Sequence, residues 1–560
     1  MLIKTIPSPT PATATLQQPD IYILAISNVQ VNLNDERHEI EARIAHQLNI
    51  SVDAIQSCTC VRRALDARKK TRIHFVCTYE VELNQKLDPL PINTRLIEHA
   101  SLIATTPELL DRKVNNDEHV IIIGAGPAGL FSALALAEAG LRVTLLERGK
   151  QVETRMRDIG RLRSRGELNP ESNICFGEGG AGTYTDGKLY TRIKHPFLRH
   201  VLHTFVRFGA RQDILVDAHP HLGTDKLVRI VRNMRERLIE LGVDYRFETR
   251  VDDLLMINGA VTGVRATNLA TQEIDEITAT DVVLATGHSA RDTFERLQEL
   301  GIKMEAKAFA VGVRAEHPQE LIDNIQFGAS ATHPKLHAAE YSLAHQHKDK
   351  YLGKRGVYSF CMCPGGLIVP SPTEEGHMAV NGMSNAKRAG RWANSGLVVQ
   401  VTPEDLSRHG MKETPLMGIT FQRELESATF KAASNQYASP TMKLTDFISG
   451  KASGTLASNR FKPAAIPSDL HNLFPNWISQ PLSDGIRAFD RKMRGYITEE
   501  ANLFGAETRT SSPIRIERGE DMQSINASGL FPVGEGAGYA GGIVSAAVDG
   551  LKAAAAIINR

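Results

Sequence analysis

The clearest hydrophobic pattern in the chain lies between residues 120 and 149. Four β-branched apolar residues, 120–123, predict a buried strand, and glycines follow at positions 124, 126 and 129. A helix of small apolar residues is expected next, and a second buried strand over 143–146 ends at Glu147. Strand, glycine turn, helix and acid-ended strand in this order predict a βαβ unit that binds a dinucleotide.

Each glycine of this turn has a separate expected role. Gly124 permits the tight turn, Gly126 lets a pyrophosphate approach the backbone, and Gly129 lets the helix pack closely on the sheet. Pro127 and Ala128 open the helix, where the missing proline N–H is no loss. The helix N-terminus therefore faces the expected phosphates with free N–H groups.

The second strand of the unit supplies an acidic residue. Glu147 is expected to accept hydrogen bonds from a ribose diol, and Arg148 beside it is assigned to the same cofactor site.

Glycine-rich turns, helices and buried strands continue to about residue 302. Segment 173–192 is crowded with glycines, Gly179 and Gly180 among them, and such density predicts close approach of backbone to a ligand. Thr224 is expected to cap an amphipathic helix, and a turn at Asn258 and Gly259 should join two strands. A buried strand over 282–284 should break at Thr286 and Gly287.

Upstream of the glycine turn, the pattern predicts a separate small α/β module. Strands are expected over 21–33 and 71–83, with an amphipathic helix over 35–50 between them. The basic segment 61–74 is interpreted as a solvated helix or loop, with a nucleic-acid or phosphate patch as the alternative. Residues 1–20 are interpreted as a flexible arm, because they are rich in Pro and Thr and lack the apolar region of a signal peptide.

The fold class predicted from these patterns is α/β. An N-terminal α/β module over 1–106 and a linker over 107–118 precede a Rossmann-like FAD/NAD(P)-binding domain, whose first part is 119–302. Scattered strands and helical pieces predict an inserted α+β substrate domain over 303–500. Strand, glycine turn and small-residue helix return in 501–560, which is expected to close the nucleotide-binding domain.

Composition narrows the class of protein. The chain has 560 residues, 42% of them hydrophobic and 23% charged, and a net charge of +1. Such a balance gives no overall field that would collect nucleic acid or an anionic membrane. No stretch has the apolar length of a transmembrane helix, so a cytoplasmic protein without a membrane partner is expected. Six cysteines without a CxxC pair argue against a disulfide framework and structural zinc, and no metal site is predicted.

The separated glycine motifs resemble flavoproteins of the glutathione-reductase-like superfamily, in which an FAD-binding domain is interrupted by a substrate domain. The resemblance implies that Ala285, Thr286 and Gly287 lie against the cofactor, and that Gly534 and Glu535 contact its ribityl chain or pyrophosphate. It also implies that the helix starting near 540–543, with Gly541, Gly542 and Ile543, points at the flavin pyrimidine. A backbone contact from Arg250 and Val251 to the adenine is implied as well.

More narrowly, GEGGAGTYTDGKL, ATGHSARD, GLFPVGEGAGYAGGI and RRALDARKK resemble a bacterial family of uncharacterised FAD-dependent dehydrogenases. The cofactor is therefore expected to be FAD. The long flavin half of FAD needs the extra enclosure that C-terminal motifs provide, whereas NAD alone does not. Only one dinucleotide fingerprint occurs, so NAD(P)H would act as a transient donor.

Two residues are predicted to be catalytic. Arg509 could anchor an anionic substrate or face the reduced flavin, with a surface ion pair as the alternative. His288, which follows the 285–287 turn, is the best histidine candidate for a general acid or base. His219, His221 and His317 are interpreted as structural, hydrogen-bonded histidines, with a general acid or base role as the alternative.

Further polar residues near these motifs have open roles. Arg515 could act as Arg509 does, and Glu507, Ser511 or Ser512 could orient the substrate. Asp186 and Lys188 could touch the cofactor loop or cap a turn. Cys361 and Cys363 have the spacing of a redox pair on one strand face, but buried small apolar residues are the preferred interpretation, because so short a disulfide loop is strained.

Together these features predict an oxidoreductase that transfers a hydride between a small-molecule substrate and flavin N5. The two alternatives are a flavoenzyme that acts on RNA through the basic N-terminal module, and a flavin-binding redox sensor without turnover. Near-zero net charge disfavours the RNA alternative.

Overall fold

The structure is a computed structural model that describes residues 22–97, 107–114, 118–349 and 353–560. The chain divides into two compact units, which are treated separately below. The predicted flexible arm, 1–20, lies outside the described residues.

The first unit is a four-stranded antiparallel sheet with one helix. Its strands are β1 (Tyr22–Asn32), β2 (Ile55–Asp66), β3 (His74–Leu83) and β4 (Thr94–Leu96), in the order β2-β3-β1-β4, and its helix is α1 (Arg37–Leu48). Leu24 and Ile26 of β1 pack with Ile44 of α1 in a small apolar core. The predicted strand-helix-strand pattern is present.

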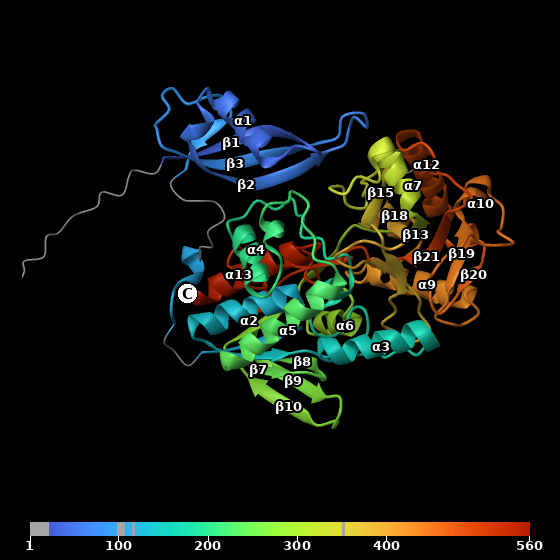
Figure 1. Ribbon diagram of the computed structural model, residues 1–560. Helices are drawn as coiled ribbons and strands as arrows, with labels where there is room; N and C mark the ends of the chain where they lie inside the picture. Colours follow the sequence, from blue (N-terminus) through green and yellow to red (C-terminus); the bar gives the residue numbers. More distant parts are fainter. Residues whose placement is uncertain (1–21, 98–106, 115–117, 350–352) are drawn as a thin grey trace, which may run out of the picture. The chain divides into compact units, whose positions relative to one another are not determined.

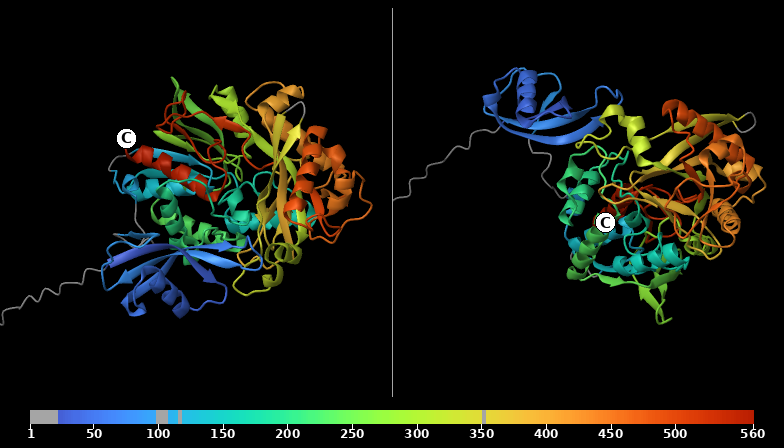
Figure 2. Two further views of the ribbon diagram at one scale, coloured as in Figure 1. Left: turned by 90° about the horizontal axis from the view of Figure 1, so that it is seen from above. Right: turned by 45° about the vertical axis from the view of Figure 1, so that its right-hand side comes forward.

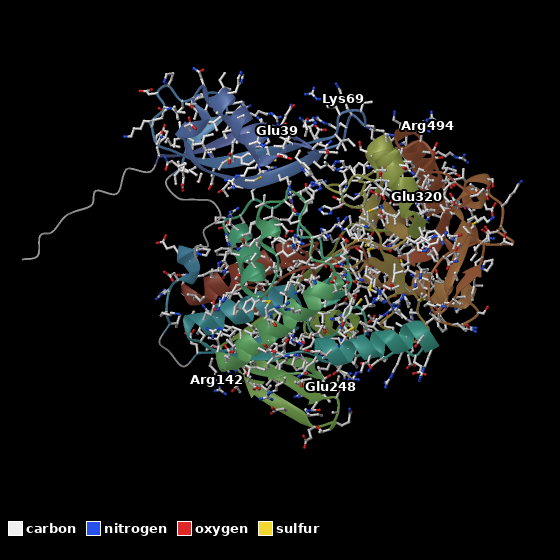
Figure 3. The ribbon with its side chains drawn as sticks, viewed as in Figure 1. Glu39, Lys69, Arg142, Glu248, Glu320 and Arg494 are labelled. Carbon is white, nitrogen blue, oxygen red and sulfur yellow. The ribbon has the colours of Figure 1, made fainter. Side chains whose placement is uncertain are left out.

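One prediction for this unit was wrong. Residues 61–66 of the basic segment belong to β2, which pairs with β3 along its length, and are not a helix or loop. The pairing of β2 with β3 has two bulges, so exposed and half-buried residues do not alternate regularly along β2. The two-residue period that identifies a strand is therefore missing from the sequence. Lys69 lies in the turn after β2 (Figure 3).

The second unit is built on a five-stranded parallel sheet. Its order is β23-β11-β5-β6-β7, from β5 (His119–Ile123), β6 (Arg142–Leu146), β7 (Asp244–Arg246), β11 (Asp281–Leu284) and β23 (Leu530–Pro532). Strand β5 is central and fully buried, as its unbroken apolar run predicts. Strand β23 brings the C-terminal segment next to β11.

Both faces of this sheet are covered. Val120 and Ile122 face a core that they share with α2 (Pro127–Ala139), α4 (Phe197–Arg207), α5 (Thr224–Glu240) and α13 (Ile543–Ile558). Ile121 and Ile123 face α6 (Arg291–Glu299) and the antiparallel sheet β8 (Thr249–Ile257), β9 (Ala260–Asn268) and β10 (Ile274–Thr278). Figures 1 and 2 show α2 and α13 side by side on one face.

The second unit also contains a seven-stranded sheet (Figure 1). Its order is β14 (Ala344–Asp349), β15 (Gly353–Cys363), β18 (Trp392–Val401), β13 (Phe309–Pro318), β21 (Asn502–Glu507), β19 (Ser439–Lys443) and β20 (Ala465–Pro467). Two small sheets pair β12 (Met304–Ala306) with β22 (Ile514–Ile516) and β16 (Leu367–Pro370) with β17 (Val380–Met383).

The other helices are α3 (Val152–Arg165), α7 (Gln319–Phe327), α8 (Pro403–Arg408), α9 (Met417–Ala432), α10 (Leu444–Ser449), α11 (Leu470–Leu473) and α12 (Asn476–Lys492). Short 3-10 turns lie at Val52–Ala54, Glu108–Leu110, Ala181–Tyr184, Gln212–Leu215 and Gly328–Ser330. None of the helices in the described part of the chain has the length and apolarity needed to cross a membrane.

Two boundary details differ from the sequence prediction. Strand β21 falls in the predicted closing segment, 501–560, but pairs with β13 and β19 of the large sheet. All six residues of β21 are buried, so its sequence looks like that of a buried strand of a parallel sheet. Thr224 is the first residue of α5 rather than its cap, because Gly223 holds the N-cap position and the Thr224 hydroxyl donates to the Thr185 carbonyl. The turn at Asn258 and Gly259 is confirmed, between β8 and β9.

Candidate functional site

The site begins at the glycine turn between β5 and α2, at the carboxyl edge of the parallel sheet. Gly124 has a φ of +99°, and a Cβ there would lie 2.6 Å from the Ala285 carbonyl oxygen. A Cβ at Gly129 would collide with the Gly124 carbonyl oxygen. Gly126 is the N-cap of α2, and Pro127 occupies its first turn. The predicted strand-turn-helix geometry is therefore present, and two of its glycines are required by close backbone contacts.

The second glycine segment lies directly against this turn. The Gly179 N–H donates to the Ala125 carbonyl at 2.8 Å. Gly180 has a φ of +62°, and a Cβ there would lie 3.0 Å from the Gly126 Cα. Two glycine-rich segments that are about 50 residues apart in the sequence thus form one continuous backbone surface.

Arg155 of α3 holds the second glycine segment in place, a role that was not predicted from the sequence. Its guanidinium is fully buried and donates to the carbonyls of Asn173, Ile174, Gly177, Glu178 and Gly180. The only sequence signal was an arginine on the apolar side of an amphipathic helix. Because all five acceptors are backbone oxygens, Arg155 fixes the path of the loop rather than a side chain.

Glu147 lies at the end of β6, beside the glycine turn. Its carboxylate accepts from the N–H groups of Ala125 at 2.9 Å, Gly149 at 2.8 Å and Gly177 at 3.0 Å. The acid therefore joins the two glycine segments, a role that the sequence did not predict. Arg148 pairs with Glu171 at 2.6 Å and Asp292 at 3.0 Å and stacks on the Phe176 ring.

Two further motifs meet at the same edge of the sheet. A Cβ at Gly536 would lie 2.5 Å from the Gly287 carbonyl oxygen, and one at Gly534 would lie 3.0 Å from the Ala128 Cβ. The side chain of Thr286, the middle residue of the 285–287 turn, is half-buried. The 285–287 and 534–536 segments therefore contact each other, and the 534–536 segment also contacts the start of α2.

The Gly534 loop is held by charged groups. Asp549 of α13 accepts from the Gly534 N–H at 2.8 Å and pairs with Arg518 at 2.7 Å. Burial raises the pKa of Glu535 to about 7, although the Lys307 cation opposes this shift. Lys307 donates to the Gly538 carbonyl at 2.8 Å.

Helix α13 starts next to this loop. Gly542 is its N-cap, a Cβ at Gly541 would meet no protein atom within 4 Å, and Ile543 packs against Gly182 of the second glycine segment. The N-terminus of α13 and its dipole therefore open toward the junction of the motifs. Val251 on β8 is half-buried and pairs with Ala266, and Arg250 pairs with Glu171 at 3.0 Å.

Three glycines at this junction leave their backbone uncovered by other protein atoms. A Cβ at Gly126 would meet nothing closer than 3.9 Å, and one at Gly287 or Gly541 would meet nothing within 4 Å. The tightly packed glycines hold the loops together, and the three open ones leave backbone accessible. Residues 124–129, 179–180, 285–287 and 534–543 would hold the phosphates, ribityl chain and ring of FAD.

The two predicted catalytic residues are close enough to interact electrostatically. His288 bonds through Nδ1 to the Ser289 hydroxyl at 2.8 Å. Burial, together with the nearby Arg509 and Arg291 cations, lowers the pKa of His288 to about 4. His288 is therefore neutral at neutral pH.

Arg509 is neither in a surface ion pair nor a free cation, the two roles that the sequence left open. It is 7% exposed, and its guanidinium pairs with Glu426 of α9 and donates to the Thr373 hydroxyl at 2.7 Å. Arg291 binds the same carboxylate at 2.8 Å and 3.0 Å. Glu426 and Arg291 were not predicted from the sequence, because a contact between residues 135 positions apart leaves no local pattern.

Other candidate residues have structural partners. Asp186 forms a buried pair with Arg388, and Lys188 lies 3.5 Å from Glu340. Arg515 pairs with Glu305 at 3.0 Å at the surface, and the Ser512 hydroxyl donates to the Gly536 carbonyl at 3.2 Å.

The remaining histidines and Glu507 are also accounted for. His219 bonds to Glu340 at 3.0 Å, His221 to the Ala386 carbonyl at 3.1 Å, and buried His317 to the Tyr496 carbonyl at 2.9 Å. All three histidines therefore have the hydrogen-bond partners that were expected of them. Glu507 pairs with Arg314 at 2.8 Å inside the large sheet.

Comparison with known families agrees with this geometry. Residues 308–510 match the FAD-dependent protein C-terminal domain-like family, 155–315 the FAD binding domain and 119–175 the FAD dependent oxidoreductase family. An uncharacterized protein of Clostridium beijerinckii is 40% identical over 552 residues, which are 96% of this chain and 99% of the relative. The chain belongs to the FAD-dependent oxidoreductase family. The cofactor of this oxidoreductase is FAD.

Other similarities of the oxidoreductase cover less or are more distant. An L-amino-acid oxidase of Bungarus fasciatus is 51% identical over 45 residues, 8% of this chain and 9% of the relative. The flavin-dependent halogenase CmlS is 15% identical, with a TM-score of 0.35 over 79% of this chain and 58% of its own. Residues 24–82, most of which belong to the first unit, match a domain of unknown function.

Proposed function

We propose that this protein transfers a hydride between a small-molecule substrate and N5 of its flavin. The observation that carries the proposal is the meeting of residues 124–129, 179–180, 285–287 and 534–543 at one edge of the parallel sheet. Bound FAD supplies the hydride chemistry, and the chain supplies binding, orientation and electrostatics.

The residues of the junction have distinct roles in this proposal. The N-termini of α2 and α13 stabilise negative charge, α2 at the pyrophosphate and α13 at the flavin pyrimidine. His288 stays neutral at neutral pH because its pKa is about 4. It can therefore accept a hydrogen bond from substrate, but it does not deliver a proton as an imidazolium.

Arg509 is a positioning residue in this proposal. Its guanidinium is occupied by Glu426 and Thr373, so it has no free fork for an anionic substrate. Burial is the main cause of the low pKa of His288, and the charge of Arg509 adds to it, together with that of Arg291.

Anaerobic mixing with NADH or NADPH tests the proposal. Rapid bleaching of the flavin absorption, followed by reoxidation on addition of an electron acceptor, is the expected result for an enzyme with a nicotinamide donor. Flavin that neither donor nor any of a panel of small alcohols, amines and acids reduces would contradict it and favour a redox sensor.

Binding of total tRNA at two salt concentrations tests the other alternative. Salt-sensitive retention of tRNA by the protein would favour an enzyme that acts on RNA. The contacts of the described residues give that alternative no specific support.

A further inference from the structure

An exposed pair of aromatic rings lies shortly after the second glycine segment. The ring centroids of Tyr190 and His219 are 4.8 Å apart, and the ring planes are inclined at 42°. Tyr190 is 53% exposed, and the side chain of His219 is 63% exposed. Much of the Tyr190 surface is therefore open to a further planar group.

The two rings are held in place by the protein itself. His219 bonds through Nδ1 to Oε1 of Glu340 at 3.0 Å. The residue before Tyr190, Leu189, is buried and donates its N–H to the carbonyl of Pro220 at 2.9 Å. Because Pro220 follows His219, this bond joins the two segments that carry the rings. Rings that are already held in place lose little conformational entropy when a ligand stacks on them.

Two cations follow Tyr190 in the same segment. Arg192 and Lys194 are exposed, as Tyr190 is, whereas residues 191 and 193 are half-buried. This alternation places the three exposed side chains on the solvent side of the segment. Neither Arg192 nor Lys194 has an ion-pair partner among the residues that the structure describes.

The acidic residues of this region already have basic partners. Oε2 of Glu340 lies 3.5 Å from Nζ of Lys188 and 3.7 Å from Nη1 of Arg388. Asp186 forms its buried pair with Arg388. Lys188 and Arg388 therefore balance the two carboxylates. Arg192 and Lys194 add positive charge beside the aromatic rings.

We propose that Tyr190, His219, Arg192 and Lys194 form a binding site for a nicotinamide dinucleotide. Its adenine stacks on the open side of Tyr190, and its phosphates bind to Arg192 and Lys194. The arrangement suits this ligand because a nucleotide joins a planar base to phosphate groups. The inference rests on the proposed function, since it gives the hydride donor a site apart from the one fingerprint that holds FAD.

The size of the site favours a small nucleotide over an RNA strand. One aromatic pair and two cations provide for one base and its phosphates. A single-stranded nucleic acid is bound by several aromatic platforms along a basic groove. The net charge of +1 also gives the chain no overall field that would attract RNA.

The first test is equilibrium dialysis of the FAD-loaded, full-length protein against NADP⁺ at constant ionic strength. FAD fills the site at the glycine turn, and the oxidised dinucleotide cannot reduce the flavin. Tyr190→Ala should bind NADP⁺ at least about tenfold more weakly than wild type, whereas Tyr190→Phe, which keeps the ring, should bind as wild type does. No saturable binding to wild type, or equal binding by wild type and Tyr190→Ala, would overturn the proposal.

The second test replaces the cations. Arg192→Met and Lys194→Met should each bind NADP⁺ about fivefold more weakly and show a smaller loss of affinity as salt is added. Lys451→Met, which removes an exposed lysine elsewhere in the second unit, is the control and should behave as wild type. Equal affinity in all three variants would overturn the assignment of the phosphates.

Two further measurements separate this inference from the alternatives. An oligoadenylate of six nucleotides that binds at least tenfold more tightly than NADP⁺ would overturn the proposal in favour of RNA. Flavin that no donor reduces, in a protein that still binds NADP⁺ through Tyr190, would contradict the proposed function alone. Rapid flavin reduction by NADPH that is equally fast in wild type and Tyr190→Ala, at NADPH concentrations that do not saturate, would overturn the inference alone.

Discussion

Glu426 and Arg509 form a buried, two-point ion pair. Nε of Arg509 donates to Oε1 of Glu426 at 3.0 Å, and Nη2 donates to Oε2 at 2.9 Å. Arg291 binds the same carboxylate, so one buried anion holds two cations next to His288. The pair links α9, which packs near the seven-stranded sheet, to the segment between β21 of that sheet and β23 of the parallel sheet.

Replacement of Glu426 by Gln should strongly destabilise the second unit. The change leaves the buried Arg509 guanidinium without a carboxylate partner and leaves Arg291 with Glu374 alone, at a cost of about 3–5 kcal/mol. Urea unfolding measures this loss. Glu424→Gln, on the exposed face of the same helix, is the matched control and should change stability little. A Glu426→Gln protein as stable as the control would show that the pair contributes no net stability.

Arg155→Met should loosen the second glycine segment. Five carbonyl oxygens lose their buried donor, which should cost about 3 kcal/mol or more and weaken FAD retention. Thermal unfolding and flavin content after gel filtration measure both effects. Arg157→Met, exposed on the same helix, should retain both properties. Normal flavin content in Arg155→Met would mean that the loop needs no such anchor.

Alanine substitutions should separate the roles of two glycines in the first turn. Gly129→Ala should prevent correct folding, because the new Cβ collides with the Gly124 carbonyl oxygen. Gly126→Ala should fold, because its Cβ meets no protein atom closer than 3.9 Å, but should bind FAD at least about tenfold more weakly. Circular dichroism and equilibrium dialysis with FAD check these outcomes. Unchanged FAD affinity in Gly126→Ala would place the pyrophosphate elsewhere.

Glu316 should make the protein less stable as the pH rises. It is 1% exposed on β13, its Oε2 has no partner among the described residues, and burial raises its pKa to about 8 from 4.5. Between these values the unfolded chain releases a proton that the folded chain keeps. Glu316 therefore costs the fold nothing below about pH 4.5. Between about pH 4.5 and about pH 8 its burial lowers the free energy of unfolding by about 1.4 kcal/mol per pH unit.

The variant Glu316→Gln should remove this part of the pH dependence. Denaturant unfolding at several pH values would show a flatter profile than that of wild type. Glu320→Gln, at the exposed start of α7, should keep the wild-type slope (Figure 3). Parallel profiles for wild type and Glu316→Gln would contradict the assignment.

The sequence was sufficient where function depends on local backbone geometry. The order of β5, glycine turn, α2 and β6 follows from apolar periods and glycines within about 30 residues, and the structure confirms it. The 285–287 and 534–536 motifs required the family resemblance, because their contact joins segments about 250 residues apart.

Residues held by long-range contacts were beyond prediction. Arg155 and Glu426 look like ordinary charged residues of amphipathic helices, and only tertiary packing buries them. Glu147 was assigned to a ribose from its place at a strand end, yet three backbone N–H groups bind it in the structure. Strand β15 has a bulge at Cys361, whose φ is +43°, and the bulge was not predicted because a positive φ at cysteine has no sequence signature.

The central claim is that four distant segments together hold one FAD. The most direct measurement is the absorption spectrum of the purified full-length protein, followed by mass identification of the compound that denaturation releases. The account predicts a flavin spectrum and one FAD per chain. A folded protein that carries no flavin and takes up none when FAD is added would contradict it.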